Sequence, residues 1–306
     1  MNHKLKEQPT ICAIILDYYG NSKTIACLIS LIDQGLDTVL IVDNSGDPTA
    51  NKQLQEALLT FGQKKVSFVI HRIVNQQNLG YAKGINQALQ WLEKNHPHQY
   101  YLLINNDAEA TPDMLPHLLE YMNEHKETAI TAPVIDLGHK QLAGFWYHRI
   151  SGLMFTRNFI GAIPYLTGCC LLVDCRIVGK GLFDEDFFMY GEDVDLAWRL
   201  HLAGWDTACV SQAIVRHQGI GSSHQGGFFY EYHLALGHIL LAKKLARYKF
   251  ETPLLYLGRL LTLSVRAVVR AIRFQSLIPI TASVSALRPV HKSIESISHR
   301  GGNDEQ

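Results

Sequence analysis

Four short apolar segments recur along the first third of the chain, and each is separated from the next by a stretch long enough for a helix. Apolar and polar residues do not alternate within these segments, which is typical of strands buried on both faces of a sheet. Repeated strand–helix units predict an α/β fold with a mostly parallel sheet flanked by helices. Two further apolar segments extend the series. The six predicted strands are 11–16, 38–42, 66–70, 100–104, 129–134 and 166–173.

The composition is that of a globular protein without a nucleic-acid partner. With 306 residues, 47% of them hydrophobic, the chain can bury a full core. Lys plus Arg equals Asp plus Glu at 28 each, which gives no sign of nucleic-acid binding. The six cysteines show neither CxxC pairs nor zinc spacing, so we expect reduced thiols. Residues 1–10 lack the apolar segment of a signal peptide, so we expect the chain to remain in the cytoplasm.

Polar side chains follow the predicted strands at the point where each strand ends. Asp17 and Tyr18 follow the first, Asp43 follows the second, and Asn106 and Asp107 follow the fourth. In parallel sheets, ligands bind beyond the carboxyl ends of the strands. Asp and Asn also form turns, so any one of these positions could be a turn alone. Their recurrence at one edge of the sheet favours a binding site.

Two further segments carry polar or glycine residues at places suited to ligand binding. Gly80 and Gly84 lie at the entry of a predicted helix, where glycine permits close approach of the backbone to a ligand. The segment is neither GxGxxG nor a P-loop, which argues against a dehydrogenase or a nucleoside triphosphatase. His217 follows an apolar run at 208–215. The chain has fifteen histidines, so we expect any single one to be a metal ligand only where a partner such as a carboxylate can be named.

Three carboxylates stand within four positions near the middle of the chain. Glu192, Asp193 and Asp195 follow an aromatic run at 187–190 and open an apolar helical pattern. Acidic residues at a helix start interact favourably with the helix dipole, which accounts for the charge but not for the aromatic residues. A carboxylate held among apolar rings is suited to act as a general base. Asp195 lies four residues before Arg199, a spacing that predicts an ion pair on the helix.

Taken in order, these motifs resemble the inverting glycosyltransferase family 2, in particular its rhamnosyltransferase-like branch. The resemblance runs from about residue 11 to residue 241. It implies the GT-A nucleotide-diphospho-sugar transferase fold, a Rossmann-like and mostly parallel sheet, here followed by a C-terminal helical extension. The segments that carry it are 15–19, 42–45, 78–86, 103–107, 167–170, 181–188, 191–199, His217 and 219–222.

The resemblance implies a donor pocket at the strand ends. In the family, the aspartate that matches Asp43 binds the nucleotide base, the residues that match Asp17 and Tyr18 line the same pocket, and the loop that matches 78–83 closes over the nucleoside. Relatives often carry Asn where this chain has Asp17. The nucleotide-sugar-binding residues expected on this basis are Asp17, Tyr18, Asp43, Asn78, Gly80, Lys83, Asn106 and Asp107.

The resemblance also implies a divalent cation. Asp107 matches the DxD-type element that holds Mn²⁺ or Mg²⁺ on the donor diphosphate, and His217 matches a histidine that often completes the site. The third position of the element is Glu109, which departs from the family pattern but supplies a workable oxygen ligand. We therefore expect Asp107, Glu109 and His217 as metal ligands.

Asp193 matches the general base of the family. Inverting transfer is a single in-line displacement, so it needs one carboxylate to take the proton of the acceptor hydroxyl and no covalent nucleophile. Glu192 is the next candidate for this role. On the acceptor side we expect Glu192, Trp198 and Arg199.

The expected function is transfer of rhamnose from dTDP-rhamnose to a glycan or lipid-linked acceptor in cell-surface polysaccharide synthesis. UDP-galactofuranose, UDP-glucose and UDP-GlcNAc stay open as donors. A non-catalytic nucleotide-sugar-binding scaffold is the alternative from another class. The presence of Asp107, Asp193 and His217 together argues against it, because a binder has no use for Asp193. The sequence leaves the acceptor, the linkage and the oligomeric state open.

The sequence divides into a catalytic domain at 1–241 and a basic amphipathic helical region with a polar tail at 242–306. Thr252 and Pro253 predict the start of a helix. From Lys243 to Arg300 there are eleven Lys or Arg residues and two acidic ones. Four arginines fall on one stripe of this helix, with Leu, Val and Ile on the opposite faces. They are Arg259, Arg266, Arg270 and Arg273.

This division of the helix favours peripheral contact between the arginines and the inner face of the plasma membrane. Packing of a solvated helix on the core is the alternative. Spanning the bilayer is disfavoured, because each central arginine costs about 2.5 to 3.5 kcal/mol on the insertion scale.

Overall fold

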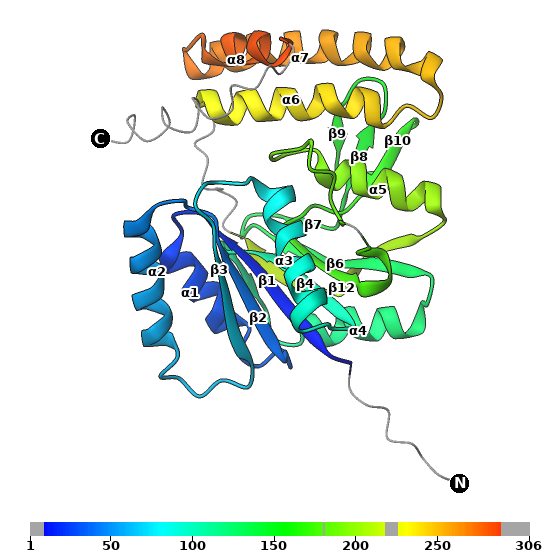
Figure 1. Cartoon of the computed structure of the whole chain (residues 1–306). Helices are drawn as coiled ribbons and strands as arrows, with labels where there is room; N and C mark the ends of the chain where they lie inside the picture. The colour runs from blue at the N-terminus through cyan, green and yellow to red at the C-terminus, as the bar shows by residue number, and fades with distance from the viewer. Residues whose placement is uncertain (1–8, 180, 218–225, 289–306) are drawn as a thin grey trace.

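The computed structural model describes residues 9–179, 181–217 and 226–288. Within them, helices and short strands alternate along the first half, and three helices close the chain (Figure 1). The helices are α1 (Asn21–Ser30), α2 (Pro48–Phe61), α3 (Tyr81–Asn95), α4 (Met114–Glu124), α5 (Glu192–Ala203), α6 (Phe228–Lys244), α7 (Thr252–Phe274) and α8 (Ile278–Ala286). The strands are β1 (Ile11–Asp17), β2 (Thr38–Asp43), β3 (Val69–Val74), β4 (Tyr100–Asn105), β5 (Ala108–Ala110), β6 (Thr128–Asp136), β7 (Gln141–Leu142), β8 (Phe145–His148), β9 (Met154–Phe155), β10 (Ala162–Tyr165), β11 (Cys170–Asp174) and β12 (Asp206–His217).

The described strands form one large mixed sheet and one small sheet. The large sheet has the order β3-β2-β1-β4-β11-β6-β12-β5, and β7 pairs with β6. The first four strands along the chain are parallel to one another, as predicted, and β12 runs parallel to β6. β11 is antiparallel to both β4 and β6, and β5 is antiparallel to β12. The small sheet has the order β10-β8-β9 and was not predicted, because its strands are only two to four residues long.

Two predicted strands differ from the observed ones. The segment predicted at 66–70 pairs only from Val69, and β3 continues to Val74 at the edge of the sheet. Phe68 is buried and stacks on Phe61 of α2, so this apolar side chain packs under a helix ahead of the strand. The strand predicted at 166–173 pairs only from Cys170. In the second segment apolar character marked burial but not the start of hydrogen-bonded pairing, whereas in the first only Phe68 is buried and Val69 is 58% exposed.

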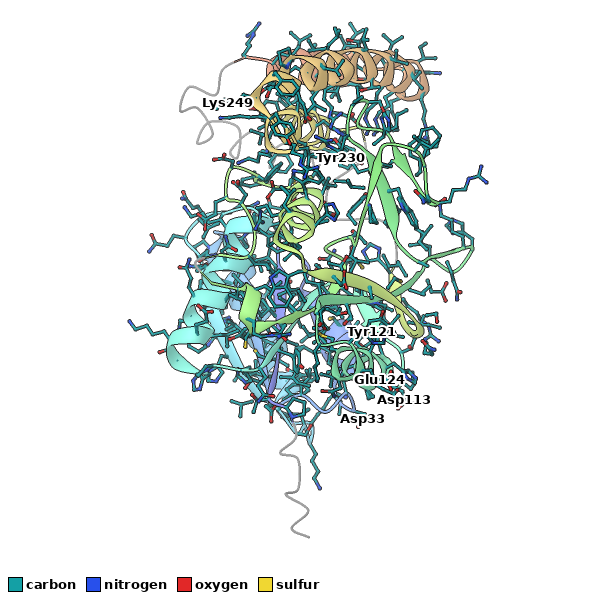
Figure 2. The ribbon with its side chains drawn as sticks, turned by 90° about the vertical axis from the view of Figure 1, so that its right-hand side faces the viewer. Asp33, Asp113, Tyr121, Glu124, Tyr230 and Lys249 are labelled. Atoms are coloured by element: carbon teal, nitrogen blue, oxygen red, sulfur yellow. The ribbon has the colours of Figure 1, made fainter. Side chains whose placement is uncertain are left out.

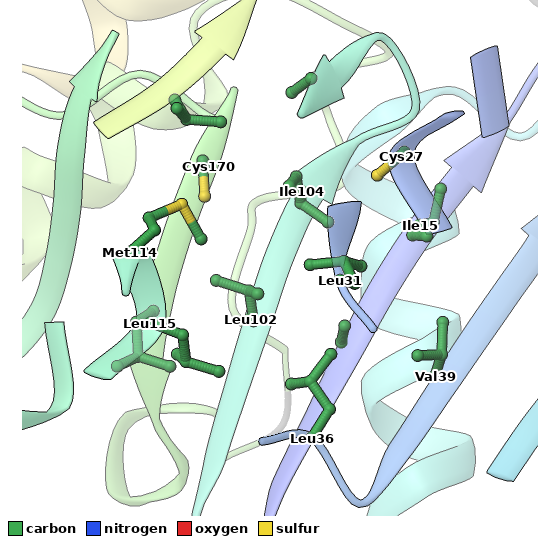
Figure 3. Close-up of a cluster of buried hydrophobic side chains, with 14 of the residues drawn as sticks. Ile15, Cys27, Leu31, Leu36, Val39, Leu102, Ile104, Met114, Leu115 and Cys170 are labelled. Atoms are coloured by element: carbon green, nitrogen blue, oxygen red, sulfur yellow. The ribbon is translucent and has the colours of Figure 1, made fainter. Parts of the chain in front are cut away.

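The alternation of side chains along β1 divides the core into two layers. Ala13 and Ile15 point toward α1, α2 and α4, where they join a buried cluster shown in Figure 3. Cys12 and Ile14 point to the opposite face, where α3 and part of α5 cover them. Because both faces are covered, the strand is apolar without alternation. The carboxyl ends of β1, β2 and β4 are left as the polar edge.

The last three helices form a layer of their own at one end of the molecule (Figure 1). Figure 2 shows Tyr230 of α6 and Lys249 in this layer, whereas Tyr121 and Glu124 of α4 lie toward the opposite end. α8 packs against both α6 and α7. α6 runs across position 241, and the division of the chain into domains at that position stays a prediction.

The arginines of α7 point in the opposite direction from the one predicted. Arg259 is 1% exposed and donates a hydrogen bond to the Ile150 carbonyl. Nε of Arg270 lies 2.7 Å from Oε1 of Glu231 on α6. Arg273 alone of the four is exposed. The amphipathic division was correct, but most of the arginine stripe faces inward, where Arg259 contacts a backbone carbonyl and Arg270 a carboxylate.

The ion pair between Arg270 and Glu231 predicts a large stability effect. Their side chains are 12% and 4% exposed, so Glu231→Ala would leave a buried guanidinium without its carboxylate. We expect a loss of about 3–5 kcal/mol in the free energy of unfolding, measured by urea denaturation. The matched control is Glu56→Ala, which removes the partner of Lys52 in a pair that is 64% and 79% exposed. The control should cost at most about 1 kcal/mol, and equal losses would contradict the assignment.

Candidate active site

The ends of β1, β2 and β4 bring predicted residues together. Asp17 and Asp43 are register partners on neighbouring strands, and each is 1% exposed. Asp17 accepts hydrogen bonds from the hydroxyl of Thr24 and, at 3.2 Å, from Nδ2 of Asn106. Burial raises the pKa of Asp17. Asn106 follows β4, so its hydrogen bond to Asp17 joins the end of β4 to the end of β1.

The carboxylate of Asp43 organises the turn that follows β2. It accepts hydrogen bonds from the backbone nitrogen of Ser45 at 3.1 Å, from Oγ of Ser45 at 2.6 Å and from Nδ2 of Asn51 at 2.9 Å. Tyr18 is 36% exposed and contacts Tyr19 edge to face. A fixed carboxylate beside an accessible ring is an arrangement that can hold a base by hydrogen bonding and stacking.

Asn44 connects this turn to the glycine loop, a role that the sequence did not assign to it. Its Nδ2 donates to Oδ1 of Asn78 at 2.8 Å, and its Oδ1 accepts from Nδ2 of Asn75 and from the backbone nitrogen of Leu79, both at 3.0 Å. Asn78 in turn accepts from the backbone nitrogen of Gly80 at 2.9 Å. The polar run after β2 was the only signal for Asn44. Lys83 is exposed on the first turn of α3.

The glycine loop is joined directly to the segment that precedes α5. The backbone nitrogen of Tyr81 donates to the carbonyl of Phe188 at 2.7 Å. Gly80 has φ +79°, and a Cβ there would collide with the same carbonyl oxygen. Only glycine combines this backbone conformation with so close an approach. The loop predicted to cover the donor is thus fixed to the segment that carries the carboxylates.

Asp107 and His217 are adjacent although 110 residues separate them. Nε2 of His217 lies 3.1 Å from Oδ1 of Asp107, because β5 and β12 pair next to both residues. A carboxylate and an imidazole are ordinary ligands of Mn²⁺, and phosphate oxygens and water can complete its coordination. Glu109 is partly exposed on β5. Across the described part of the chain, no three His, Cys, Asp or Glu side chains are grouped to hold one ion, so Glu109 as a third ligand stays a prediction.

Glu192 and Asp193 occupy the first turn of α5, after Gly191 with φ +103°. Glu192 is buried, and no hydrogen-bond partner is found for its Oε2 among the described residues. Burial and the neighbouring charge of Asp193 raise the pKa of Glu192. Burial also raises the pKa of Asp193, against hydrogen bonds from the backbone of Val194 and Gly168. Two carboxylates with raised pKa values at one helix start can take up a proton near neutral pH.

The backbone at Gly168 lies between the glycine loop and these carboxylates. The hydroxyl of Tyr81 donates to the Gly168 carbonyl at 2.8 Å, and the Gly168 backbone also hydrogen-bonds Asp193. Asp193 keeps partial exposure, whereas Glu192 does not. Of the two residues, Asp193 is therefore the more accessible.

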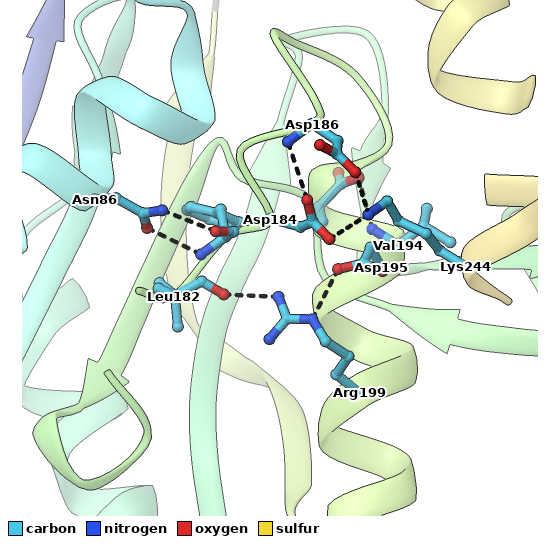
Figure 4. A network of polar contacts seen from close by, with 10 residues as sticks. Asn86, Leu182, Asp184, Asp186, Val194, Asp195, Arg199 and Lys244 are labelled. Carbon is cyan, nitrogen blue, oxygen red and sulfur yellow. Dashed lines mark hydrogen bonds and ion pairs between the residues drawn. The ribbon is translucent and has the colours of Figure 1, made fainter. Parts of the chain in front are cut away.

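Trp198 and Arg199 make contacts that stabilise the fold. Trp198 is buried in a cluster with Tyr147 and lies 4.7 Å beneath the guanidinium of Arg149. Nε of Arg199 lies 2.7 Å from Oδ2 of Asp195, which confirms the predicted ion pair on the helix. Figure 4 shows Arg199 also reaching the carbonyl of Leu182. An acceptor-side role for Trp198 and Arg199 stays a prediction.

The sequence missed a buried aromatic and imidazole cluster above α5. The hydroxyl of Tyr147 lies 2.6 Å from Nδ1 of His238, and the guanidinium of Arg259 lies 5.1 Å from the centre of the Tyr147 ring. The ring of Phe188 stacks on that of His233 with centroids 4.6 Å apart. No spacing rule could have found these contacts, because α6, α7 and β8 meet only in the folded chain.

Comparisons with known proteins find one matching family model and two curated relatives. The family model "Glycosyl transferase family 2" matches residues 13–182, more than half of the chain. The N-acetylglucosaminyl-diphospho-decaprenol L-rhamnosyltransferase of Mycobacterium tuberculosis, strains CDC 1551 / Oshkosh and ATCC 25618 / H37Rv, is 44% identical over 192 residues. That match covers 53% of this chain and 62% of the relative, so it spans less than two thirds of the relative's length.

Two solved structures show the same GT-A fold. The mannosyltransferase PcManGT from Pyrobaculum calidifontis, in complex with GDP-Man and Mn²⁺, aligns with a TM-score of 0.57 and 12% identity, covering 97% of this chain and 85% of its own. GalNAc-T7 with UDP, GalNAc and Mn²⁺ aligns with a TM-score of 0.57 and 13% identity, covering 78% of this chain and 48% of its own. At these identities the likeness confirms the fold that the sequence predicted, and nothing further.

The contact at Gly80 predicts that a methyl group will disrupt the site. Gly80→Ala adds a clash with the Phe188 carbonyl to the strain of a positive φ, so we expect it to lose about 2–4 kcal/mol of stability. Gly138→Ala is the matched control, because Gly138 has φ +81° and no atom within 4 Å of an added Cβ. The control should lose only about 1–2 kcal/mol. Urea denaturation of both variants measures the difference, and equal losses would show that the contact contributes little.

Proposed function

Because this chain belongs to glycosyl transferase family 2, we propose that it is an inverting glycosyltransferase that moves rhamnose from dTDP-rhamnose to a lipid-linked glycan acceptor in cell-surface polysaccharide synthesis. The observation that carries the proposal is the partly exposed Asp193, held at a helix start beside the loop that follows the donor-side strands. The similarity to a rhamnosyltransferase supports the choice of sugar. The relative's name also supports an acceptor in which N-acetylglucosamine is linked to a polyprenyl diphosphate.

In this mechanism Asp193 removes the proton of the acceptor hydroxyl as that oxygen attacks the anomeric carbon. The bond from that carbon to the donor diphosphate breaks in the same step, so the configuration is inverted and no covalent intermediate forms on the chain. The raised pKa of Asp193 makes it a stronger base than a solvated aspartate. Glu192, with its higher burial, holds its proton more readily and keeps a second negative charge away from the base.

The donor would lie over the ends of β1, β2 and β4. Asp43 is suited to accept a hydrogen bond from the nucleotide base, with Asp17 and Tyr18 beside it. The loop held by Asn44 and Asn78 would cover the nucleoside. Because this loop is tied to Phe188, its closure over the nucleoside also fixes the start of α5. A bound donor would therefore lie at a set distance from Asp193.

The pairing of Asp107 with His217 fits a divalent cation, which we include as Mn²⁺ or Mg²⁺. When bound, such a cation neutralises the charge of the diphosphate leaving group. Asp107 would hold it through its carboxylate and His217 through Nε2. Both proteins of similar fold described above were solved with Mn²⁺, which supports this part of the proposal.

A polyprenyl-linked acceptor lies in a membrane, so we include peripheral contact with the inner face of the plasma membrane in the proposal. Catalysis would then take place on the cytoplasmic side, where nucleotide sugars are made. The oligomeric state stays open.

Replacement of the base predicts a loss of turnover without a loss of donor binding. Asp193→Asn keeps the shape of the side chain but cannot accept the proton, so transfer from dTDP-rhamnose to a GlcNAc-diphosphate lipid should fall roughly 10²- to 10⁴-fold. The shift in melting temperature on adding dTDP with Mn²⁺ should be unchanged. Activity should also fall as the pH drops through the raised pKa of Asp193, because only the deprotonated carboxylate acts as a base.

Glu192→Gln is the matched variant for this test. It removes one carboxylate from the same turn, and transfer should fall less than in Asp193→Asn. Near-normal turnover in Asp193→Asn together with an inactive Glu192→Gln would move the base to Glu192. Stabilisation by UDP but not by dTDP would point to a UDP-sugar donor. Nucleotide binding without turnover on any donor would favour the scaffold function.

Removal of the divalent cation should also abolish transfer, by an effect that can be separated from loss of the base. EDTA should abolish transfer, and added Mn²⁺ or Mg²⁺ should restore it. His217→Ala should weaken the binding of dTDP in the presence of Mn²⁺ about 10- to 100-fold and leave the binding of thymidine unchanged, because the cation contacts the phosphates. His139→Ala, which changes an exposed histidine, is the control. Full activity in metal-free buffer would remove both Asp107 and His217 from the ligand set.

A further inference from the structure

The outward side of α7 is apolar along nearly its whole length. Leu257, Leu261 and Val265 are 56%, 62% and 65% exposed, and they follow one another at the four-residue spacing of one helix face. Soluble proteins rarely leave contiguous apolar surface of more than a few hundred Å² uncovered. We call this surface the α7 stripe. Its members are Leu254, Leu257, Leu261, Val265, Val268 and Ile272.

The polar side chains of α7 hold the stripe outward. Arg259 donates to the carbonyl of Ile150, and Thr262 donates to the carbonyl of Ser151 in the same turn between β8 and β9. Arg270 pairs with Glu231 of α6. If α7 rotated to bury its leucines, these hydrogen bonds and the ion pair would break. The apolar exposure is therefore built into the packing.

The charges around the stripe complement an anionic surface. The sequence has no Asp or Glu from Thr252 to Arg288, and both Arg273 and Arg288 are exposed. Just before α7, the exposed rings of Tyr248 and Phe250 stack with centroids 5.4 Å apart. Lys249, between them in the sequence, is also exposed. Aromatic rings and cationic side chains beside an apolar helix face are typical of the boundary between lipid headgroups and acyl chains.

We propose that the α7 stripe inserts into the headgroup–acyl boundary of a lipid bilayer, with α7 lying in the plane of the membrane. The contact is apolar, and the inward-facing arginines anchor the helix to the protein. No helix in the described ranges is long and apolar enough to cross a membrane. A second protein is the weaker occupant, because protein interfaces carry about one hydrogen bond per 100–200 Å². Between Leu254 and Ile272, Ser264 is the one polar residue that is exposed.

The position of α7 connects this surface to the start of α5. The guanidinium of Arg270 lies 5.4 Å from the centre of the Tyr230 ring on α6, and that ring contacts Tyr190 edge to face at 5.3 Å. Tyr190 precedes Gly191 and the two carboxylates of α5. The membrane contact rests on the proposed function only in that a lipid-linked acceptor would lie at the same surface. Binding to lipid needs neither donor nor acceptor.

Vesicle flotation of the full chain tests the proposal. The intact protein should float with neutral phosphatidylcholine vesicles at 0.5 M salt, because apolar insertion is not screened. A triple variant with Leu257→Gln, Leu261→Gln and Val265→Gln should reduce partitioning at least about tenfold. The matched control changes three exposed apolar residues on other helices, with Ile29→Gln, Leu59→Gln and Leu202→Gln, and should float like the intact protein.

A gentler variant guards against misfolding. Val265→Thr with Val268→Thr is nearly isosteric and should still reduce partitioning several-fold, with an unchanged melting temperature. Flotation only with anionic vesicles and only at low salt would overturn apolar insertion in favour of a purely electrostatic contact. If light scattering shows a dimer of the intact chain, the triple variant is monomeric and the intact chain does not float, the stripe would be assigned to a second copy. Transfer to a water-soluble GlcNAc acceptor should survive the triple variant, so a loss of lipid binding is distinguishable from a failure of the proposed chemistry.

Discussion

The hydrogen bond from the backbone of Tyr81 to the carbonyl of Phe188 joins the two halves of the candidate active site. One half, at the ends of β1, β2 and β4, is built from the parallel strands. The other half is the first turn of α5, which begins more than 80 residues after the end of β4. Both partners of this bond are backbone atoms, so their separation is not adjustable by side-chain rotation. Gly80 makes the approach sterically allowed, and no other residue could take its place without moving one half against the other.

The same contact extends into the helical layer. The ring of Phe188 stacks on that of His233, and Lys244 near the end of α6 contacts Asp184 and Asp186 in the loop before α5 (Figure 4). α6 is thus attached to the loop before α5 at two separate points along its length. The helices that follow the catalytic region in sequence therefore support the start of α5 from above. A candidate site placed between a sheet edge and such a layer has rigid walls, which would hold the reacting groups of the proposed transfer in a fixed geometry.

The sequence predicted the parallel units and the polar strand ends because both follow from local pattern. Apolar segments without alternation indicated strands covered on both faces of a sheet. Because these strands are parallel, the residues that follow them, Asp17, Asp43 and Asn106, lie at one edge. The pairing of Asp107 with His217 came from family resemblance, since no local rule relates residues so far apart. Contacts such as Asn44 with Asn78, or Tyr147 with His238, depend on which loops meet. Periodicity defined the two faces of α7 but not which one is inside, because that depends on the carboxylate of Glu231 and on the carbonyls of Ile150 and Ser151.

Glu231 on α6 is therefore one of the residues that set an orientation of α7 that α7 itself does not encode. Taken alone, the sequence of α7 would turn its leucines inward on most protein surfaces, as amphipathic helices do. The orientation depends on α6 and on the turn between β8 and β9, so both would have to accompany α7 if its outer face were to be preserved in another protein. In a comparison of relatives, a change at position 231 would be expected to accompany a reversal of polarity along α7. These segments would then diverge together, independently of the strands of the proposed donor site.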